Sequence, residues 1–179
     1  MNNNLTLLDR TFEPMISSEE ILERVSQLAE VISRDYAGKK PIFLSVLNGA
    51  FMFTSDLLKS INLDCEVHFV RYKSYEGVES TGKVKELMGV PEEVNGRDVI
   101  VVEDIVESGK TIEYLSKKLE INQPASVKIC ALLFKPSCYH KSIPITYSAF
   151  EIGEEFVVGY GLDYDGAGRN LKEIYRETT

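Results

Sequence analysis

The segment VIVVEDIVESGKT, residues 99–111, decides the fold and indicates where the site lies. It opens with a run of β-branched apolar residues, which predicts a buried strand. Two adjacent carboxylates, Glu103 and Asp104, follow this run, and a short loop containing Ser108 and Gly109 leads into a helix. Because free backbone amides and the helix dipole meet at a helix N-terminus, the loop is suited to bind an anion.

The closing Gly-Lys-Thr is shared with nucleotide-binding P-loops, whose full pattern needs a glycine five positions before Gly109. That position is Asp104, and its charge would repel a triphosphate. One phosphate beside two carboxylates indicates a phosphorylated ribose, whose vicinal hydroxyls donate to the carboxylates while the loop holds the phosphate. The alternative is an acidic helix start that only complements the helix dipole. Residues 159–161 form no dinucleotide fingerprint, because Tyr164 occupies its third glycine position.

Hydrophobic periodicity on both sides of this segment predicts an α/β protein with a largely parallel sheet. A first helix is expected after Ser17 and Glu20, which have the spacing of a capping box, and it should end at Gly38. Further helices are expected at residues 51–58 and 111–119, and strands at residues 41–47, 65–72, 98–102, 127–134, 145–150 and 156–160. In such sheets ligands bind beyond the carboxyl ends of the strands.

Composition excludes several classes of function. The 179 residues fit one domain, and the formal net charge of −8 opposes binding to nucleic acid. Three cysteines and two histidines show no zinc-ligand spacing. No apolar stretch reaches the roughly 20 residues of a membrane helix, and the first residues do not resemble a signal peptide. We therefore expect a cytoplasmic protein with no membrane and no nucleic-acid partner.

Residues 101–111 resemble the phosphoribosyl pyrophosphate (PRPP) motif of type I phosphoribosyltransferases. Segments that resemble the hypoxanthine-guanine phosphoribosyltransferase family follow in order: residues 46–49, 73–75, 132–136 and 156–164, with Arg169. The resemblance spans about residues 40–175 and implies the type I fold, a mainly parallel sheet flanked by helices. It also implies one domain of residues 1–179, a mobile flap at about residues 73–84, and a hood made by the N-terminal segment and residues 150–179.

The implied activity is purine salvage. In this family a ring nitrogen of hypoxanthine or guanine displaces pyrophosphate from PRPP, which gives IMP or GMP. Magnesium is the implied cofactor, beside Glu103, Asp104 and Asp163, because a hard divalent ion stabilises the charge on the leaving group. The family also implies a homodimer or homotetramer. The resemblance places the 5-phosphate at Ser108, Gly109, Lys110 and Thr111.

Base recognition is implied for five residues. Glu107 stands where the family usually has an aspartate that serves as general acid and base; its extra methylene shifts the carboxylate. Lys135 would donate to the 6-oxo group, and its alternative role is a lysine that snorkels at a strand end. Phe156 would stack on the purine, with core packing as the alternative, while the backbone of Val157 and Asp163 would meet its edge.

Pyrophosphate contacts are implied for the remaining residues. The backbone at Asn48 and Gly49 corresponds to a strained, often cis, peptide of the family. The family commonly has lysine or arginine in place of Asn48. The alternative is a plain Asn-Gly turn. Arg169 would meet pyrophosphate or, alternatively, form a surface salt bridge. Lys73 would reach pyrophosphate, and the flap residues that would close over the reaction centre are Ser74 and Tyr75.

Two other functions stay open at this point. A PRPP-sensing regulator could keep the fold and bind nucleic acid, although the charge of −8 opposes it. A transferase for another base is the second alternative. Lys135 and residues 156–163 oppose a pyrimidine, whereas hypoxanthine, guanine and xanthine differ only at the 2-position and cannot be ranked from side chains.

Overall fold

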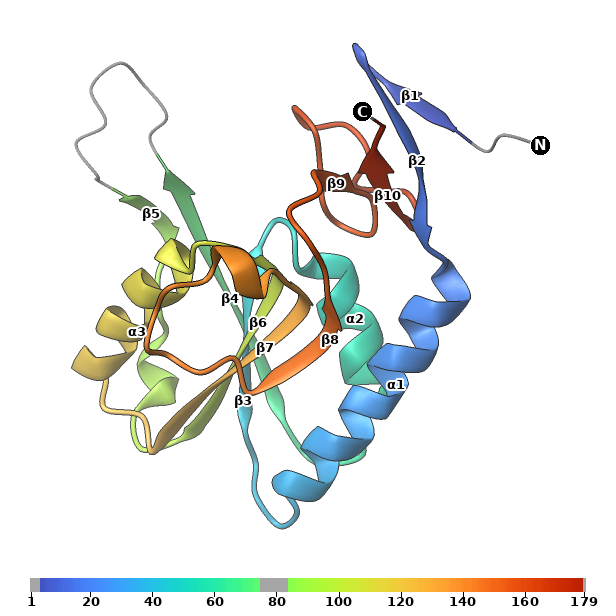
Figure 1. Cartoon of the computed structure of the whole chain (residues 1–179). Helices are drawn as coiled ribbons and strands as arrows, with labels where there is room; N and C mark the ends of the chain where they lie inside the picture. Colours follow the sequence, from blue (N-terminus) through green and yellow to red (C-terminus); the bar gives the residue numbers. More distant parts are fainter. Residues whose placement is uncertain (1–3, 75–83, 179) are drawn as a thin grey trace.

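The computed structural model describes residues 4–74 and 84–178 and contains two β-sheets (Figure 1). The larger sheet has six strands in the order β5-β4-β3-β6-β7-β8. All its neighbouring pairs are parallel except β4 and β5. Its strands are β3 (Ile42–Leu47), β4 (Glu66–Ser74), β5 (Val84–Met88), β6 (Asp98–Val106), β7 (Ser126–Phe134) and β8 (Tyr147–Glu151). The α/β class and the mainly parallel sheet are confirmed.

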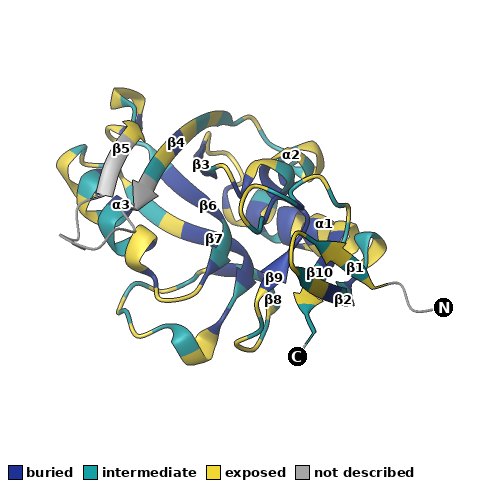
Figure 2. Cartoon of the chain, turned by 90° about the horizontal axis from the view of Figure 1, so that it is seen from above, coloured by how far each residue is buried: buried dark blue, intermediate teal, exposed yellow. Residues whose placement is uncertain are grey.

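Three helices cover the two faces of this sheet. They are α1 (Ser18–Asp35), α2 (Phe51–Ser60) and α3 (Lys110–Ile121), with 3-10 turns η1 (Glu92–Val94) and η2 (Pro136–Cys138). Along β6, Ile100 and Val102 pack in the cluster with α1 and α2, whereas Val99 and Val101 pack with α3. Because successive residues of a strand point to opposite faces, a continuous apolar run serves both layers. Buried residues therefore concentrate in the centre of the sheet (Figure 2).

The first helix begins as its sequence predicts. The Ser17 hydroxyl accepts from the Glu20 backbone N–H at 3.3 Å, and the Glu20 carboxylate accepts from the Ser17 N–H at 3.0 Å. This reciprocal capping box satisfies two backbone donors at the helix start. No helix in the described residues is both long and apolar enough to cross a membrane.

The smaller sheet has the order β1-β2-β10-β9 and joins both ends of the described chain (Figure 1). Its strands are β1 (Leu5–Leu7), β2 (Arg10–Ile16), β9 (Val157–Val158) and β10 (Ile174–Glu177). β1, β2 and β10 were not predicted, because β1 and β10 have only three and four residues and β2 lacks a continuous apolar run. They lie in the segments expected to form a hood; the assignment of residues 1–179 to one domain stays a prediction.

Two predicted strands differ from the structure. The strand expected to end at Val102 continues to Val106, because Glu103 pairs with Ala131 of the parallel neighbour β7. The strand expected at residues 156–160 contains only Val157 and Val158. It stops because Gly159 and Tyr160 have φ of 99° and 49°, outside the extended region.

Candidate active site

Most predicted site residues lie at the carboxyl ends of three neighbouring parallel strands. Asn48 and Gly49 follow β3, residues 107–111 follow β6, and Lys135 follows β7. Since β3, β6 and β7 are adjacent and parallel, these segments share one edge of the sheet. This is the edge at which open α/β sheets bind ligands.

The acidic pair provides oxygen acceptors at this edge. Glu103 is 6% exposed, and within the described residues its Oε2 atom has no hydrogen-bond partner. Burial, and then the charge of Asp104, raise the pKa of Glu103 well above its usual range. Burial also raises the pKa of Asp104 to about 6, although backbone N–H groups and the Arg169 charge oppose this. A buried acceptor without a partner is costly, so the pair is prepared for a ligand that donates hydrogen bonds or carries positive charge.

Glycines bring two loops against Asp104. A Cβ atom at Gly49 would overlap the Asp104 carboxylate, and one at Gly161 would overlap the Gly49 carbonyl oxygen. Only glycine allows such close approaches without displacement. The peptide bond between Leu47 and Asn48 is cis, one bond before the Asn48–Gly49 peptide at which the resemblance implies it.

Asp163 and Arg169 form a tight ion pair beside this contact. The Arg169 Nη2 atom lies 2.5 Å from Asp163 Oδ1, and Nη1 donates to the Gly161 carbonyl at 2.7 Å. The second Asp163 oxygen accepts from the Gly166 N–H at 2.7 Å. Both charges act on Asp104, so the four predicted residues Gly49, Asp104, Asp163 and Arg169 occupy one region.

The carboxylates fit a metal only in combination with other ligands. Among the described residues, no three carboxylate, imidazole or thiol side chains are grouped as a metal site would require. Of the three predicted ligands Glu103, Asp104 and Asp163, Asp163 is already paired with Arg169. Hard carboxylate oxygens suit magnesium, which usually keeps water or substrate phosphate oxygens as its remaining ligands.

The loop after β6 is the segment where an anion site is predicted. Gly109 has φ of 71°, and α3 begins at the next residue. A cavity of about 150 Å³ lies here, lined by Glu103, Ile105, Val106, Glu107, Ser108, Gly109, Lys110, Thr111 and Ile112. A Cβ atom at Gly109 would overlap the ring of Tyr139, whose hydroxyl donates to the Ile143 carbonyl at 2.5 Å. Tyr139 was not predicted as a site residue, because nothing local in the sequence connects it to this loop.

Lys135 and Glu107, predicted on different segments, contact each other. Lys135 is 4% exposed, and its Nζ atom donates to the Glu107 carboxylate and, at 2.8 Å, to the Glu155 carbonyl. A snorkelling lysine would reach solvent, whereas this ammonium is buried between two acceptors. Glu155 was also missed; its position directly before Phe156 was the available signal.

Phe156 presents an exposed ring on the hood side. It is 40% exposed, and its ring centroid lies 6.2 Å from that of Phe12 and 5.9 Å from that of Tyr164. Val157 follows it, buried in β9. The ring is therefore supported by aromatic neighbours and still accessible to a flat ligand.

The flap residues are described only in part. Lys73 and Ser74 end β4, where they pair with Lys85 and Val84 of β5. Tyr75 and the rest of the expected flap up to residue 83 lie outside the described residues.

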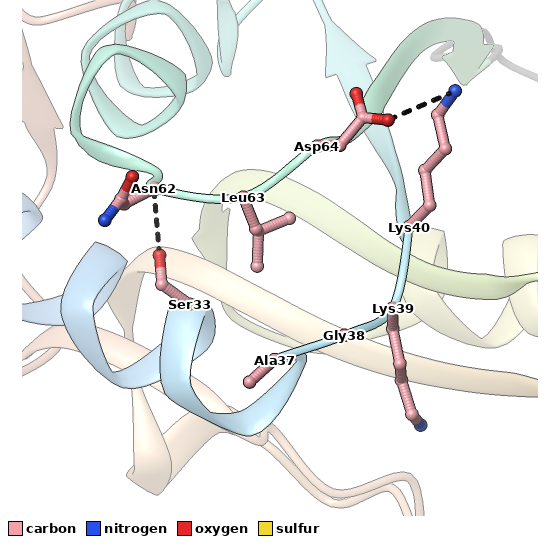
Figure 3. A pocket seen from close by; sticks show the side chains of 8 residues that line it. All are labelled: Ser33, Ala37, Gly38, Lys39, Lys40, Asn62, Leu63 and Asp64. Atoms are coloured by element: carbon pink, nitrogen blue, oxygen red, sulfur yellow. Dashed lines mark hydrogen bonds and ion pairs between the residues drawn. The ribbon is translucent and has the colours of Figure 1, made fainter.

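A larger hollow, of about 540 Å³, lies at the amino ends of β3 and β4 (Figure 3). Its lining residues are Ser33, Ala37, Gly38, Lys39, Lys40, Asn62, Leu63 and Asp64. The Ser33 hydroxyl accepts from the Asn62 N–H, and Lys40 pairs with Asp64 at 3.6 Å. None of the predicted site residues lies in this lining, so the carboxyl edge is the candidate site.

Comparison with known proteins agrees with the fold. The family model described as phosphoribosyl transferase domain matches residues 17–165. The chain therefore belongs to the phosphoribosyltransferase family, and its relatives place it more narrowly, among the hypoxanthine-guanine phosphoribosyltransferases.

Three relatives illustrate this similarity. The hypoxanthine-guanine phosphoribosyltransferase of Lactococcus lactis is 42% identical over 169 residues, which cover 93% of this chain and 92% of the relative. The hypoxanthine phosphoribosyltransferase of Escherichia coli K12 is 38% identical over 170 residues, with coverages of 93% and 96%. A crystal structure of a Bacillus anthracis hypoxanthine-guanine phosphoribosyltransferase, with HEPES in its active site, has a TM-score of 0.86 and 37% identity. That match covers 93% of this chain and 97% of the other.

Proposed function

We propose that this protein transfers the 5-phosphoribosyl group of PRPP to hypoxanthine or guanine, with magnesium, and releases IMP or GMP and pyrophosphate. The observation that carries the proposal is the shared sheet edge, where the acidic pair, the anion loop and Lys135 end neighbouring strands. A sugar bound between the loop and the carboxylates would have its anomeric carbon near the Lys135 side of the site. The three groups match the phosphate, ribose and base of one nucleotide.

The sugar phosphate would bind to the β6 segment. The backbone amides and hydroxyls of residues 108–111 would hold the 5-phosphate in the cavity at the start of α3. Glu103 and Asp104 would accept hydrogen bonds from the ribose hydroxyls, and this would provide the partner that Glu103 Oε2 lacks. With Asp163, they would also hold magnesium, which stabilises negative charge on the leaving pyrophosphate when bound.

Pyrophosphate would leave between the β3 loop and Arg169. The backbone at Asn48 and Gly49 would donate to it, and Arg169 would add charge-assisted hydrogen bonds. Lys73 would contribute further positive charge. The flap, with Ser74 and Tyr75, would exclude water from the ribosyl cation.

The base would bind between Lys135 and the hood. Lys135 would exchange the Glu107 carboxylate for the 6-oxo group, and Glu107 would then move the proton of the purine five-membered ring. An ammonium donor favours a carbonyl over the amino group of adenine. Phe156 would stack on the ring, and the backbone of Val157 and Asp163 would meet its edge.

A homodimer or homotetramer in the cytoplasm is the proposed assembly and location. Four apolar side chains on the edge strand β5 and its neighbour β4 are 40–48% exposed: Val67, Phe69, Leu87 and Met88. Such a group of exposed apolar side chains suits a subunit contact. Light scattering coupled to size-exclusion chromatography measures the assembly, and a monomer at micromolar concentration would contradict it.

The decisive experiment offers hypoxanthine, guanine, xanthine, adenine and uracil separately to the purified protein with PRPP, and quantifies nucleotide and pyrophosphate. We expect turnover of hypoxanthine or guanine, none of adenine or uracil, and none without magnesium. Binding of PRPP without turnover of any base would overturn the proposal and favour a regulator. Faster turnover of xanthine would change the assigned base.

A further inference from the structure

Arg10 lies over two aromatic rings of the hood. Its guanidinium carbon is 4.5 Å from the ring centroid of Tyr164 and 5.5 Å from that of Phe156. Arg10 begins β2, at the N-terminal end of the described chain, whereas both rings come from the segment around β9. Cations attract aromatic faces at these distances, so the contact joins distant parts of the chain.

Arg10 is itself held in place by β10. Its Nη1 atom lies 3.2 Å from Glu177 Oε2, and the preceding residue, Asp9, accepts from the Tyr164 hydroxyl at 2.8 Å. The guanidinium is therefore fixed from one side by a carboxylate, and the ring beneath it is fixed by a hydrogen bond. Both contacts restrict the rotamers that Arg10 and Tyr164 can adopt.

Phe156 depends on these neighbours for its orientation. Its ring packs on Phe12, which is fully buried in β2, and edge-on against Tyr164, with an interplanar angle of 84°. The guanidinium covers part of the ring, yet Phe156 stays 40% exposed. Since an aromatic ring has two faces, a cation at one leaves the other available for stacking.

We propose that Arg10 is a positioning residue for base binding: it fixes the Phe156 ring so that its open face receives the purine. This inference rests on the proposed function, in which Phe156 stacks on the base. Arg10 contacts Phe156, Tyr164 and Glu177. None of these is proposed to contact PRPP, whose proposed contacts come from the ends of β3, β4 and β6 and, in the hood segment, from Asp163 and Arg169. Arg10 should therefore affect the base and leave PRPP unchanged.

The test compares Arg10→Met, which keeps an apolar stem, with Glu177→Gln, which removes the ion pair but leaves the guanidinium. For Arg10→Met we expect the KM for hypoxanthine and guanine to rise roughly three- to tenfold, while the KM for PRPP and kcat stay at wild-type values. For Glu177→Gln we expect a smaller rise. An unchanged KM for the base, or equal rises for base and PRPP, would overturn the proposal, since a merely structural role affects both substrates.

A second readout follows the ring itself. The chain contains no tryptophan, so Phe156→Trp introduces a single tryptophan, whose fluorescence can be excited selectively over that of the nine tyrosines. Adding Arg10→Met to this variant should increase acrylamide quenching, because the ring loses a restraint; unchanged quenching would contradict the inference. If Arg10→Met does not fold, Arg10→Lys is the substitute, because it keeps the ion pair and loses only the planar guanidinium. Its KM for the base should rise less than in Arg10→Met, and its KM for PRPP should again stay unchanged. If the wild-type protein turns over no base, the proposed function fails. If it turns over a base but Arg10→Met does not raise the KM for the base selectively, only this inference fails.

Discussion

The proposed sugar-phosphate half of the site and the proposed base half are assembled in different ways. Along the edge of the large sheet, residues 103–111 provide the acidic pair and the anion loop from one continuous segment. On the hood side, Lys135, Phe156 and Arg10 come from three separate parts of the chain and meet only through tertiary contacts. The first half therefore depends on local backbone geometry, whereas the second depends on the packing of the small sheet against the large one.

Glu107 belongs to both halves, and its replacement should have the largest effect. Glu107→Gln removes the ionisable carboxyl group but keeps the shape, so kcat should fall by about 10²- to 10⁴-fold while the KM for PRPP changes little. Steady-state kinetics with both substrates measures this. Glu107→Asp is the matched control and should retain most of the turnover, because it keeps the acid. A Gln variant with wild-type kcat would exclude Glu107 from proton transfer.

Replacing Lys135 should weaken base binding without affecting PRPP binding. Lys135→Met removes a charged hydrogen bond worth about 1.5–3 kcal/mol, so the KM for hypoxanthine and guanine should rise roughly 10- to 100-fold. The KM for PRPP should not change. Lys128→Met, at an exposed position of the same strand, is the control and should resemble the wild type. Equal losses for PRPP and the bases would show that the two halves are not separable here.

The acidic pair should lower the stability of the sugar half at neutral pH. Burial holds the pKa of Asp104 at about 6 against 3.8 for an ordinary aspartate. The native state binds this proton more tightly than the unfolded chain, so the contribution of Asp104 to stability falls as pH rises from 3.8 to about 6, then stays constant. Without ligands, Asp104→Asn should therefore be more stable than the wild type at pH 8, by up to about 3 kcal/mol, and equal to it at pH 4.

Denaturant unfolding at both pH values measures this difference. Asp165→Asn, at an exposed position, is the control and should match the wild type at each pH. An Asn variant at residue 104 that is less stable than the wild type at pH 8 would show that the ionised carboxylate is stabilised by its surroundings.

The smallest predicted effect concerns the contact between the two loops beside Asp104. Gly161 and Gly166 have φ of 104° and 85°, so alanine is strained at both, but only at Gly161 would its Cβ overlap the Gly49 carbonyl. Gly161→Ala should therefore lower the free energy of unfolding by about 1–3 kcal/mol more than Gly166→Ala. Equal losses of unfolding free energy in the two variants would mean that backbone strain alone explains the glycine at residue 161, and that the two loops can move apart to accept a Cβ atom.

The sequence predicted the sugar half far better than the base half. Residues 99–111 carry their strand, loop and helix start in order, and the structure has all three. The apolar run and the Ser17–Glu20 capping box are local signals, because the groups that interact are a few residues apart. The extension of β6 from Val102 to Val106 was not predicted, because charged residues such as Glu103 and Asp104 usually end a buried strand.

The hood could not be predicted in the same way. The ion pair between Arg10 and Glu177 joins positions 167 residues apart. Neither residue has a local pattern that marks its partner. β1 and β10 are too short for periodicity to identify, and β2 is interrupted by Glu13 and Pro14. The contact of Lys135 with Glu107 was not predicted for the same reason, although each residue was predicted to belong to the site.

The pairing of β2 with β10 also orders events during synthesis. A ribosome releases the strands of the large sheet by residue 151, but β10, at Ile174–Glu177, emerges only afterwards. Until then Arg10 lacks its carboxylate partner and β2 lacks its neighbouring strand. The nascent chain can thus complete the β6 segment proposed to bind the ribose and the 5-phosphate before it can complete the surface proposed to select the base.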